Sequence, residues 1–202
     1  ELATAEGTQL LWNGDEKYWT DRAPVLFPFV GRLTGGQYRL HGKVYPMSIH
    51  GFAAASEFSV LEQSADAVTL ALRDNEETLR QYPLHFEFRV RYALHGRELE
   101  IGYTVRNPNA EELPFGIGGH PGFRVPLCAG TAFEDYCLRF SEPCEPDRVG
   151  FTPSVFLSGH DERYPLENAQ LLRLRHELFD DDAIILKNMA RSVTLCSDKT
   201  PL

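Results

Sequence analysis

Residues 85–94 read HFEFRVRYAL, with apolar and polar side chains in strict alternation. Successive side chains of a β-strand point to opposite faces, so this pattern predicts a strand with one buried face. His95-Gly96-Arg97 follows and predicts a tight turn, because its glycine can adopt a positive φ. Alternation resumes from Glu98 to Val105, with Leu99, Ile101, Tyr103 and Val105 on one face. Together these residues predict an antiparallel β-hairpin.

Short strand-like runs separated by turn residues continue on both sides of this hairpin. They lie at residues 38–40, 57–61, 67–72, 115–118, 136–140, 171–174, 183–186 and 192–196. Helical periodicity is confined to short stretches such as residues 75–81, and regular alternation of strands and helices is absent. The pattern predicts an all-β fold, either a sandwich or a barrel, in preference to a doubly wound α/β fold.

Size and charge limit the classes of function. The chain has 202 residues, of which 43% are hydrophobic, which suits one large β domain as well as two small ones. We expect one domain spanning residues 1–202. Its formal net charge is −9, which argues against nucleic acids and acidic membranes as partners. We find no apolar run of bilayer-spanning length. The oligomeric state cannot be read from the sequence.

The cysteines point to a reducing environment. Cys128, Cys137, Cys144 and Cys196 form no C-x-x-C pair and no zinc-type cluster with histidine, so we expect no metal site. A chain of this length does not need disulfides for stability. We therefore expect reduced thiols in a cytoplasmic protein.

Two histidines lie in glycine-rich surroundings that suit chemistry. His120 stands in Gly116-Ile117-Gly118-Gly119-His120-Pro121-Gly122-Phe123, where little side-chain bulk keeps a ligand from the imidazole. His50 stands in Ser48-Ile49-His50-Gly51-Phe52. An imidazole exchanges its proton near neutral pH, which suits acid–base catalysis. Structural hydrogen bonding within a tight turn is the alternative role for each histidine.

Two further segments carry charged groups of interest. Residues 19–33, WTDRAPVLFPFVGRL, end an apolar run with Arg32, whose guanidinium could bind sugar hydroxyls or take part in an internal ion pair. The acidic run Asp180-Asp181-Asp182 precedes an apolar strand. Such a run is either a solvated turn or a source of one carboxylate at the mouth of a sheet.

The ordered set APVLFPFVGRL, HGF, GIGGHPGF and FDDDAIILKN resembles proteins of the aldose 1-epimerase family, in the galactose mutarotase-like superfamily. The resemblance covers nearly the whole chain. It implies a large antiparallel β-sandwich, called a supersandwich, whose concave sheet holds a sugar. It also implies an isomerase of carbohydrate metabolism that interconverts α and β anomers of an aldose by acid–base ring opening, and this chemistry requires no cofactor.

The resemblance also implies roles for individual residues. His120 matches the histidine that acts as general acid on the ring oxygen, and His50 matches a second histidine that hydrogen-bonds the sugar near that oxygen. Arg32 matches a substrate-binding arginine. Asp182, or alternatively Asp181, matches the aspartate that binds a ring hydroxyl.

Two departures from the family pattern leave alternatives open. The general base of the family is a late glutamate, and no glutamate of this chain matches it, so we expect a chain incomplete at both ends that lacks the C-terminal strands. Ala54 stands where relatives commonly carry arginine. The alternatives are a non-catalytic sugar-binding domain and an epimerase of hexose phosphates, for which Arg32, Lys43 and Arg124 are candidate cations.

Overall fold

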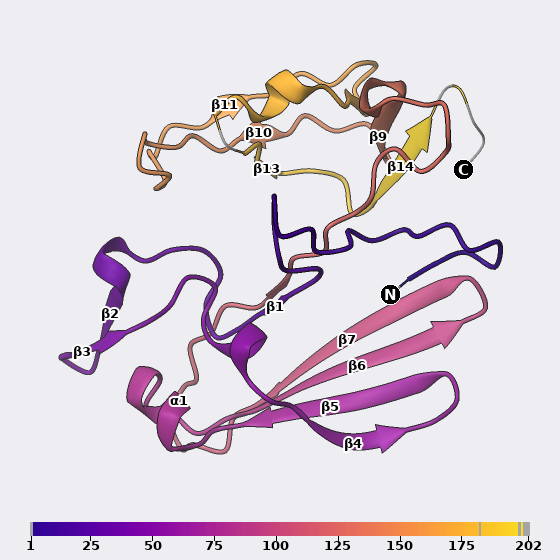
Figure 1. Ribbon diagram of the computed structural model, residues 1–202. Helices are drawn as coiled ribbons and strands as arrows, with labels where there is room; N and C mark the ends of the chain where they lie inside the picture. The colour runs from indigo at the N-terminus through magenta and orange to yellow at the C-terminus, as the bar shows by residue number, and fades with distance from the viewer. Residues whose placement is uncertain (1, 182, 198, 200–202) are drawn as a thin grey trace. The chain divides into compact units, whose positions relative to one another are not determined.

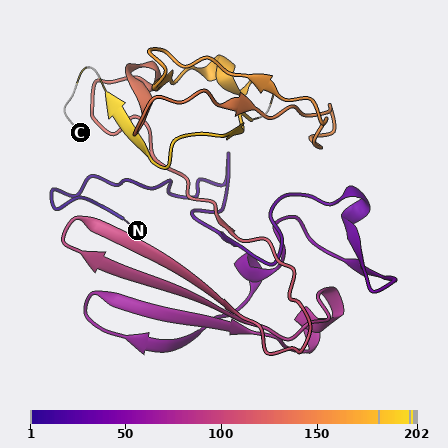
Figure 2. The ribbon, with the colours of Figure 1, turned by 180° about the vertical axis from the view of Figure 1, so that it is seen from behind.

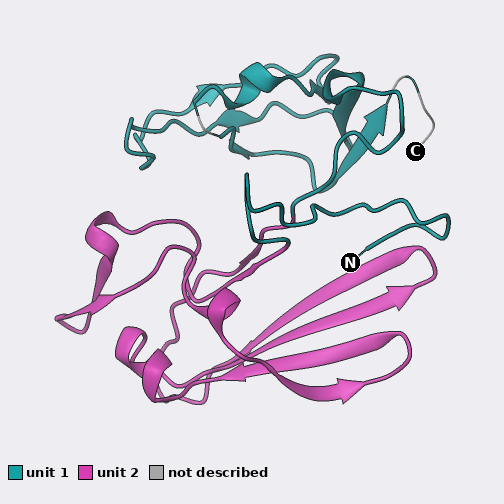
Figure 3. Ribbon diagram, viewed as in Figure 1, with its two compact units in different colours: residues 1–22, 122–202 teal, residues 23–121 magenta. Residues whose placement is uncertain are grey.

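The computed structural model describes residues 2–181, 183–197 and 199 (Figure 1). Its regular structure consists almost entirely of antiparallel strands, which confirms the predicted all-β class. Within those residues no helix is long and apolar enough to cross a membrane. The chain forms two compact units, residues 23–121 and residues 1–22 with 122–202, shown in Figure 3. Each unit is described separately.

The unit formed by residues 23–121 is built on a four-stranded antiparallel sheet, ordered β4-β5-β6-β7. These four strands lie side by side in both views (Figures 1 and 2). Their bounds are Ser59–Gln63 for β4, Ala67–Arg73 for β5, Glu87–His95 for β6 and Glu98–Arg106 for β7. The predicted hairpin is confirmed as β6 and β7, paired from Glu87↔Arg106 to His95↔Glu98.

Smaller elements complete this unit. β1 (Val25–Leu26) pairs with β8 (Gly118–Gly119), and β2 (Gln37–Leu40) pairs with β3 (Lys43–Pro46). Helix α1 (Glu76–Gln81) begins after Asn75, whose side chain accepts hydrogen bonds from the amides of Glu77 and Thr78 at 2.9 Å. This N-cap explains why a short helix forms between two strands.

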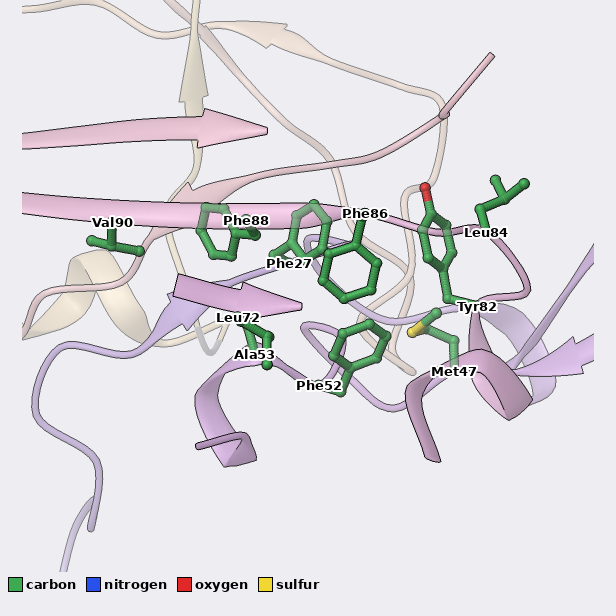
Figure 4. Packing of buried hydrophobic residues seen from close by; sticks show 10 residues of the cluster. All are labelled: Phe27, Met47, Phe52, Ala53, Leu72, Tyr82, Leu84, Phe86, Phe88 and Val90. Carbon is green, nitrogen blue, oxygen red and sulfur yellow. The ribbon is translucent and has the colours of Figure 1, made fainter. Parts of the chain in front are cut away.

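Aromatic side chains form the core of this unit (Figure 4). Phe27 is fully buried and stacks on Phe88 of β6 with ring centroids 4.6 Å apart. Phe86 and Phe52 also contact the Phe27 ring. The cluster comprises Phe27, Met47, Phe52, Ala53, Leu72, Tyr82, Leu84, Phe86, Phe88 and Val90. Burial of these rings holds the segment that carries Phe27 against the sheet.

The core covers only one end of the hairpin. Phe88 and Val90 are buried, whereas Leu94 and Ile101 are 49% and 44% exposed. The alternation correctly predicted which side chains share a face, but the burial that it predicted for β7 is wrong near the turn. β7 is the last strand in the order of its sheet, and the aromatic cluster ends at Val90.

The other unit contains two three-stranded antiparallel sheets, ordered β12-β9-β14 and β11-β10-β13. Phe140, Leu172 and Leu178 form its buried cluster. The strand bounds are Tyr136–Phe140 (β9), Asp147–Arg148 (β10), Glu162–Arg163 (β11), Leu171–Arg173 (β12), Leu186–Lys187 (β13) and Val193–Ser197 (β14). Short 3₁₀ turns in the whole chain span Thr34–Gly36, Ala53–Ala55, Phe133–Asp135 and His176–Phe179.

Candidate functional site

One extended stretch, residues 24–31, positions both glycine-flanked histidines; we name it the anchor segment. On one side it pairs with β8, and the amide of His120 continues the pairing by donating to the carbonyl of Pro24 at 3.0 Å. On the other side the amide of His50 donates to the carbonyl of Gly31 at 2.9 Å. The two histidine loops, far apart in sequence, therefore meet on the same piece of backbone.

The imidazole rings of His50 and His120 come together as a result. Their centroids are 5.5 Å apart and their planes are inclined by 38°. His50 is half-buried and His120 is exposed. The pair is therefore open to a ligand, and both rings can contact the same small molecule.

The glycine after His50 is required by close packing. Gly51 has φ of +77°, a conformation that side chains rarely adopt, and a Cβ at this position would collide with the carbonyl of Phe27. The amides of Phe52 and Ala53 both donate to that same carbonyl oxygen, at 3.0 and 3.1 Å. The His50 loop is thus held tightly against the anchor segment.

A second hydrogen bond orients the His50 ring. The amide of Gly31 donates to His50 Nδ1 at 3.0 Å, so this nitrogen acts as an acceptor. Burial, then the charge of His120, then the charge of Arg32 lower the pKa of His50 below its ordinary value of 6.5. The neutral imidazole is therefore favoured at position 50.

Arg32 follows the anchor segment and lies near the histidines, as its effect on the pKa of His50 indicates. It is exposed and, within the part of the chain that the structure describes, makes no hydrogen bond or ion pair. Of the other cations considered for a phosphate group, Lys43 begins β3 at a surface turn, and Arg124 belongs to the other unit. Arg32 is the cation that the structure places at the histidine pair.

Of the two aspartates predicted for the site, Asp181 lies in the other unit. Asp182 lies outside the described residues. Asp181 accepts a hydrogen bond from Arg148 at 3.1 Å and lines a cavity of about 690 Å³, together with His160 and Asp180. The carboxylate of Asp181 therefore already forms an ion pair with Arg148 at the surface.

Two residues of this region were missed by the sequence reasoning. Gly31 holds the His50 ring, and the hydroxyl of Tyr103 reaches Gly119, where a Cβ would lie 3.0 Å from it. Gly31 directly precedes Arg32, which the sequence marked as a candidate, and this adjacency could have indicated it. No sequence feature indicated Tyr103, because it occupies one of the alternating apolar positions of β7.

The candidate site combines one guanidinium with two imidazoles. Within the described residues no group of three or more His, Cys, Asp or Glu side chains is arranged to hold a metal ion. An exposed guanidinium and two imidazoles offer hydrogen-bond donors to oxygen acceptors. The arrangement can therefore bind hydroxyl and ether oxygens and exchange a proton with them.

Comparison with known proteins agrees with this description. The family model for aldose 1-epimerase matches residues 2–201. The chain is 37% identical to the chromosomal protein LacX of Lactococcus lactis, over 96% of this chain and 68% of that protein. The chain therefore spans about two thirds of that relative's length.

Solved structures show the same relationship. A galactose mutarotase-related enzyme from Lactobacillus acidophilus has a TM-score of 0.88 and 36% identity, covering 95% of this chain and 64% of that one. A galactose mutarotase-like protein from Lactobacillus casei has a TM-score of 0.86 and 38% identity, covering 98% and 68%. The fold is galactose mutarotase-like, and the chain belongs to the aldose 1-epimerase family.

Proposed function

We propose that the protein is an aldose 1-epimerase that interconverts the α and β anomers of a sugar at the His50–His120 pair. The observation that carries the proposal is the 5.5 Å separation of the two ring centroids, because both imidazoles can then reach one pyranose. Membership of the family supports a sugar as the substrate. Which aldose is turned over is left to experiment.

The proposed reaction opens and recloses the sugar ring. A base accepts the proton of the anomeric hydroxyl, the bond between C1 and the ring oxygen breaks, and His120 protonates that oxygen. The free aldehyde rotates about the C1–C2 bond and recloses from its other face, with the proton transfers reversed. No redox change occurs: apart from the proton transfers, only the bond between C1 and the ring oxygen breaks, and it forms again when the ring closes.

Each group has a separate part in this proposal. His120 is exposed and can deliver a proton, whereas the ring of His50 is held by Gly31 and hydrogen-bonds the sugar. Arg32 and, by family resemblance, Asp182 bind hydroxyl groups and orient the ring. The base is the glutamate that the resemblance implies and that no residue of this chain matches.

Polarimetry of sugar mutarotation tests the acid assignment. General acid–base groups contribute about 10²–10⁴-fold to a rate, so His120→Gln is expected to lower the protein-catalysed rate by about that factor. His41→Gln is the matched control, because His41 is a surface histidine that pairs with Glu111. An unchanged rate in His120→Gln would overturn the assignment.

A second candidate function is sugar binding without catalysis. It is favoured by Ala54, which lies with Ala23, Phe58 and Tyr92 in a cavity of about 240 Å³ whose lining carries no charged side chain. This alternative predicts saturable binding of an aldose by the wild-type protein with no acceleration of mutarotation. A wild-type rate above the spontaneous one would exclude it.

A further inference from the structure

We propose that Gly31 is a positioning residue that holds His50 as a neutral Nε2–H tautomer, so that His50 donates a hydrogen bond to its ligand and does not transfer its proton. The proposal deepens the proposed function, because it assigns one histidine to binding and leaves proton transfer to the other. Naming the ligand as a sugar rests on the proposed function, whereas the tautomer does not.

The hydrogen-bond geometry fixes the position of the ring proton. A neutral imidazole has one N–H donor and one acceptor nitrogen. Nδ1 of His50 is the acceptor, because the Gly31 amide donates to it at 3.0 Å. The single ring proton must then be on Nε2. The main-chain amide of His50 donates back to the carbonyl of Gly31 at 2.9 Å, so one residue holds both the backbone and the ring.

Unusual backbone conformations make this reciprocal contact possible. Gly31 has φ of +95°, and His50 has φ of +62°. A Cβ at position 31 would meet no atom within 4 Å, so glycine is favoured there by conformation and not by space. The left-handed conformation of His50 is unfavourable for a residue with a side chain, and the two hydrogen bonds help to offset its cost.

Protonation of His50 would break this arrangement. A second ring proton on Nδ1 would face the Gly31 amide, setting one donor against another and losing the hydrogen bond. The charged groups that act on His50 are His120 and Arg32, and both lower its pKa together with burial. Contact geometry and charge therefore both keep the ring neutral.

A neutral Nε2–H donor suits one kind of ligand atom. It can donate to the lone pair of a ring ether oxygen or of a hydroxyl group, but it cannot protonate the ring oxygen without losing its only ring proton. His120, whose ring centroid lies 5.5 Å from that of His50, is the proton carrier of the proposed function. The pair thus divides into a fixed donor and a proton carrier.

Nitrogen-15 NMR of the histidine rings tests the tautomer without any sugar. The His50 signals are assigned as those that disappear in His50→Gln. We expect one unprotonated Nδ1 and one protonated Nε2, and we expect this pattern to persist below pH 6.5, the ordinary pKa of a histidine. A mixture of tautomers, or a protonated Nδ1 at neutral pH, would overturn the proposal.

Matched glutamine variants test the division of roles. Glutamine keeps an N–H donor on a flexible side chain but cannot carry a proton. His50→Gln is therefore expected to keep the mutarotation rate within about tenfold, whereas His120→Gln loses about 10²–10⁴-fold. Equal losses in the two variants would contradict the division. If the wild-type protein catalyses no mutarotation, the proposed function fails, and the NMR result still decides the tautomer.

Discussion

His50 and His120 lie with their ring centroids 5.5 Å apart because both of their loops hydrogen-bond to residues 24–31, the anchor segment. The anchor segment is itself held to the sheet by Phe27, whose ring stacks on Phe88. The histidine pair therefore depends on the aromatic core as well as on its own glycine-rich loops.

The glycine after His50 is expected to be irreplaceable. Gly51→Ala should destabilise the protein well beyond Gly42→Ala, because the two glycines have φ of +77° and +79°, but only the Cβ at position 51 meets the Phe27 carbonyl. We expect about 1–2 kcal/mol for the conformational cost at Gly42. Chemical denaturation of both variants measures the difference, and equal losses would show that the close contact is unimportant.

The core ring beneath the site is expected to dominate the stability of its unit. Phe27→Ala should lower the free energy of unfolding by about 3–5 kcal/mol, the usual cost of removing a buried aromatic ring. Leu94→Ala is the control, because Leu94 lies on β6, the strand that carries Phe88, and is 49% exposed. The account is contradicted if the two variants unfold at similar denaturant concentrations.

Folding stability is expected to fall at mildly acidic pH through His50. Its pKa is lowered in the folded state, so below about pH 6.5 the unfolded chain takes up a proton that the folded protein does not. This contribution to instability grows as the pH falls from 6.5 to the lowered pKa and is constant below it. His50→Gln should flatten the pH dependence in denaturation series between pH 8 and 5, and an unaltered slope would argue against it.

Contact between Tyr103 and Gly119 is expected to set the position of the adjoining His120. In Gly119→Ala the new Cβ would lie 3.0 Å from the Tyr103 hydroxyl, so the loop or the ring must shift. Misplacing a catalytic group by about 1 Å can lower a reaction rate by about 10²-fold. The shift expected here is smaller, so we expect the mutarotation rate to fall by about three- to tenfold.

The accompanying variants make the Tyr103 contact testable. Tyr103→Phe removes the hydroxyl and should restore much of the rate to Gly119→Ala. Gly102→Ala is the control on β7, next to Tyr103, since its Cβ would lie 3.8 Å from Arg91 Cβ, an ordinary contact. Additive effects of the Gly119 and Tyr103 changes would show that the two residues do not act through one another.

Local periodicity predicted the regular part of the fold well. The alternation from residue 85 to 105 correctly gave strands β6 and β7, and the short helical stretch predicted at residues 75–81 is confirmed as α1 (Glu76–Gln81). The two-residue pair β1 and β8 was not predicted, because two residues show no period and its second strand is a pair of glycines. A strand was expected at residues 115–118, where the structure has only Gly118–Gly119.

The candidate site was predictable only in part. Glycine-flanked histidines directed attention to His50 and His120, and the structure brings them together. The hydrogen bond from Gly31 to His50 joins residues from separate loops and leaves no local pattern. The role of Asp182 stays a prediction, since that residue lies outside the described ranges.

The central claim is that one sugar contacts both histidines. Its most direct test is to record the ring signals of ¹⁵N-labelled histidine while an aldopyranose such as glucose is added. We predict that His50 and His120 shift together along one saturation curve, while His41 and His85, which pair with Glu111 and Asp74, stay unchanged. Absence of any shift at His50 and His120 across a panel of aldoses, or shifts confined to the surface histidines, would contradict the account.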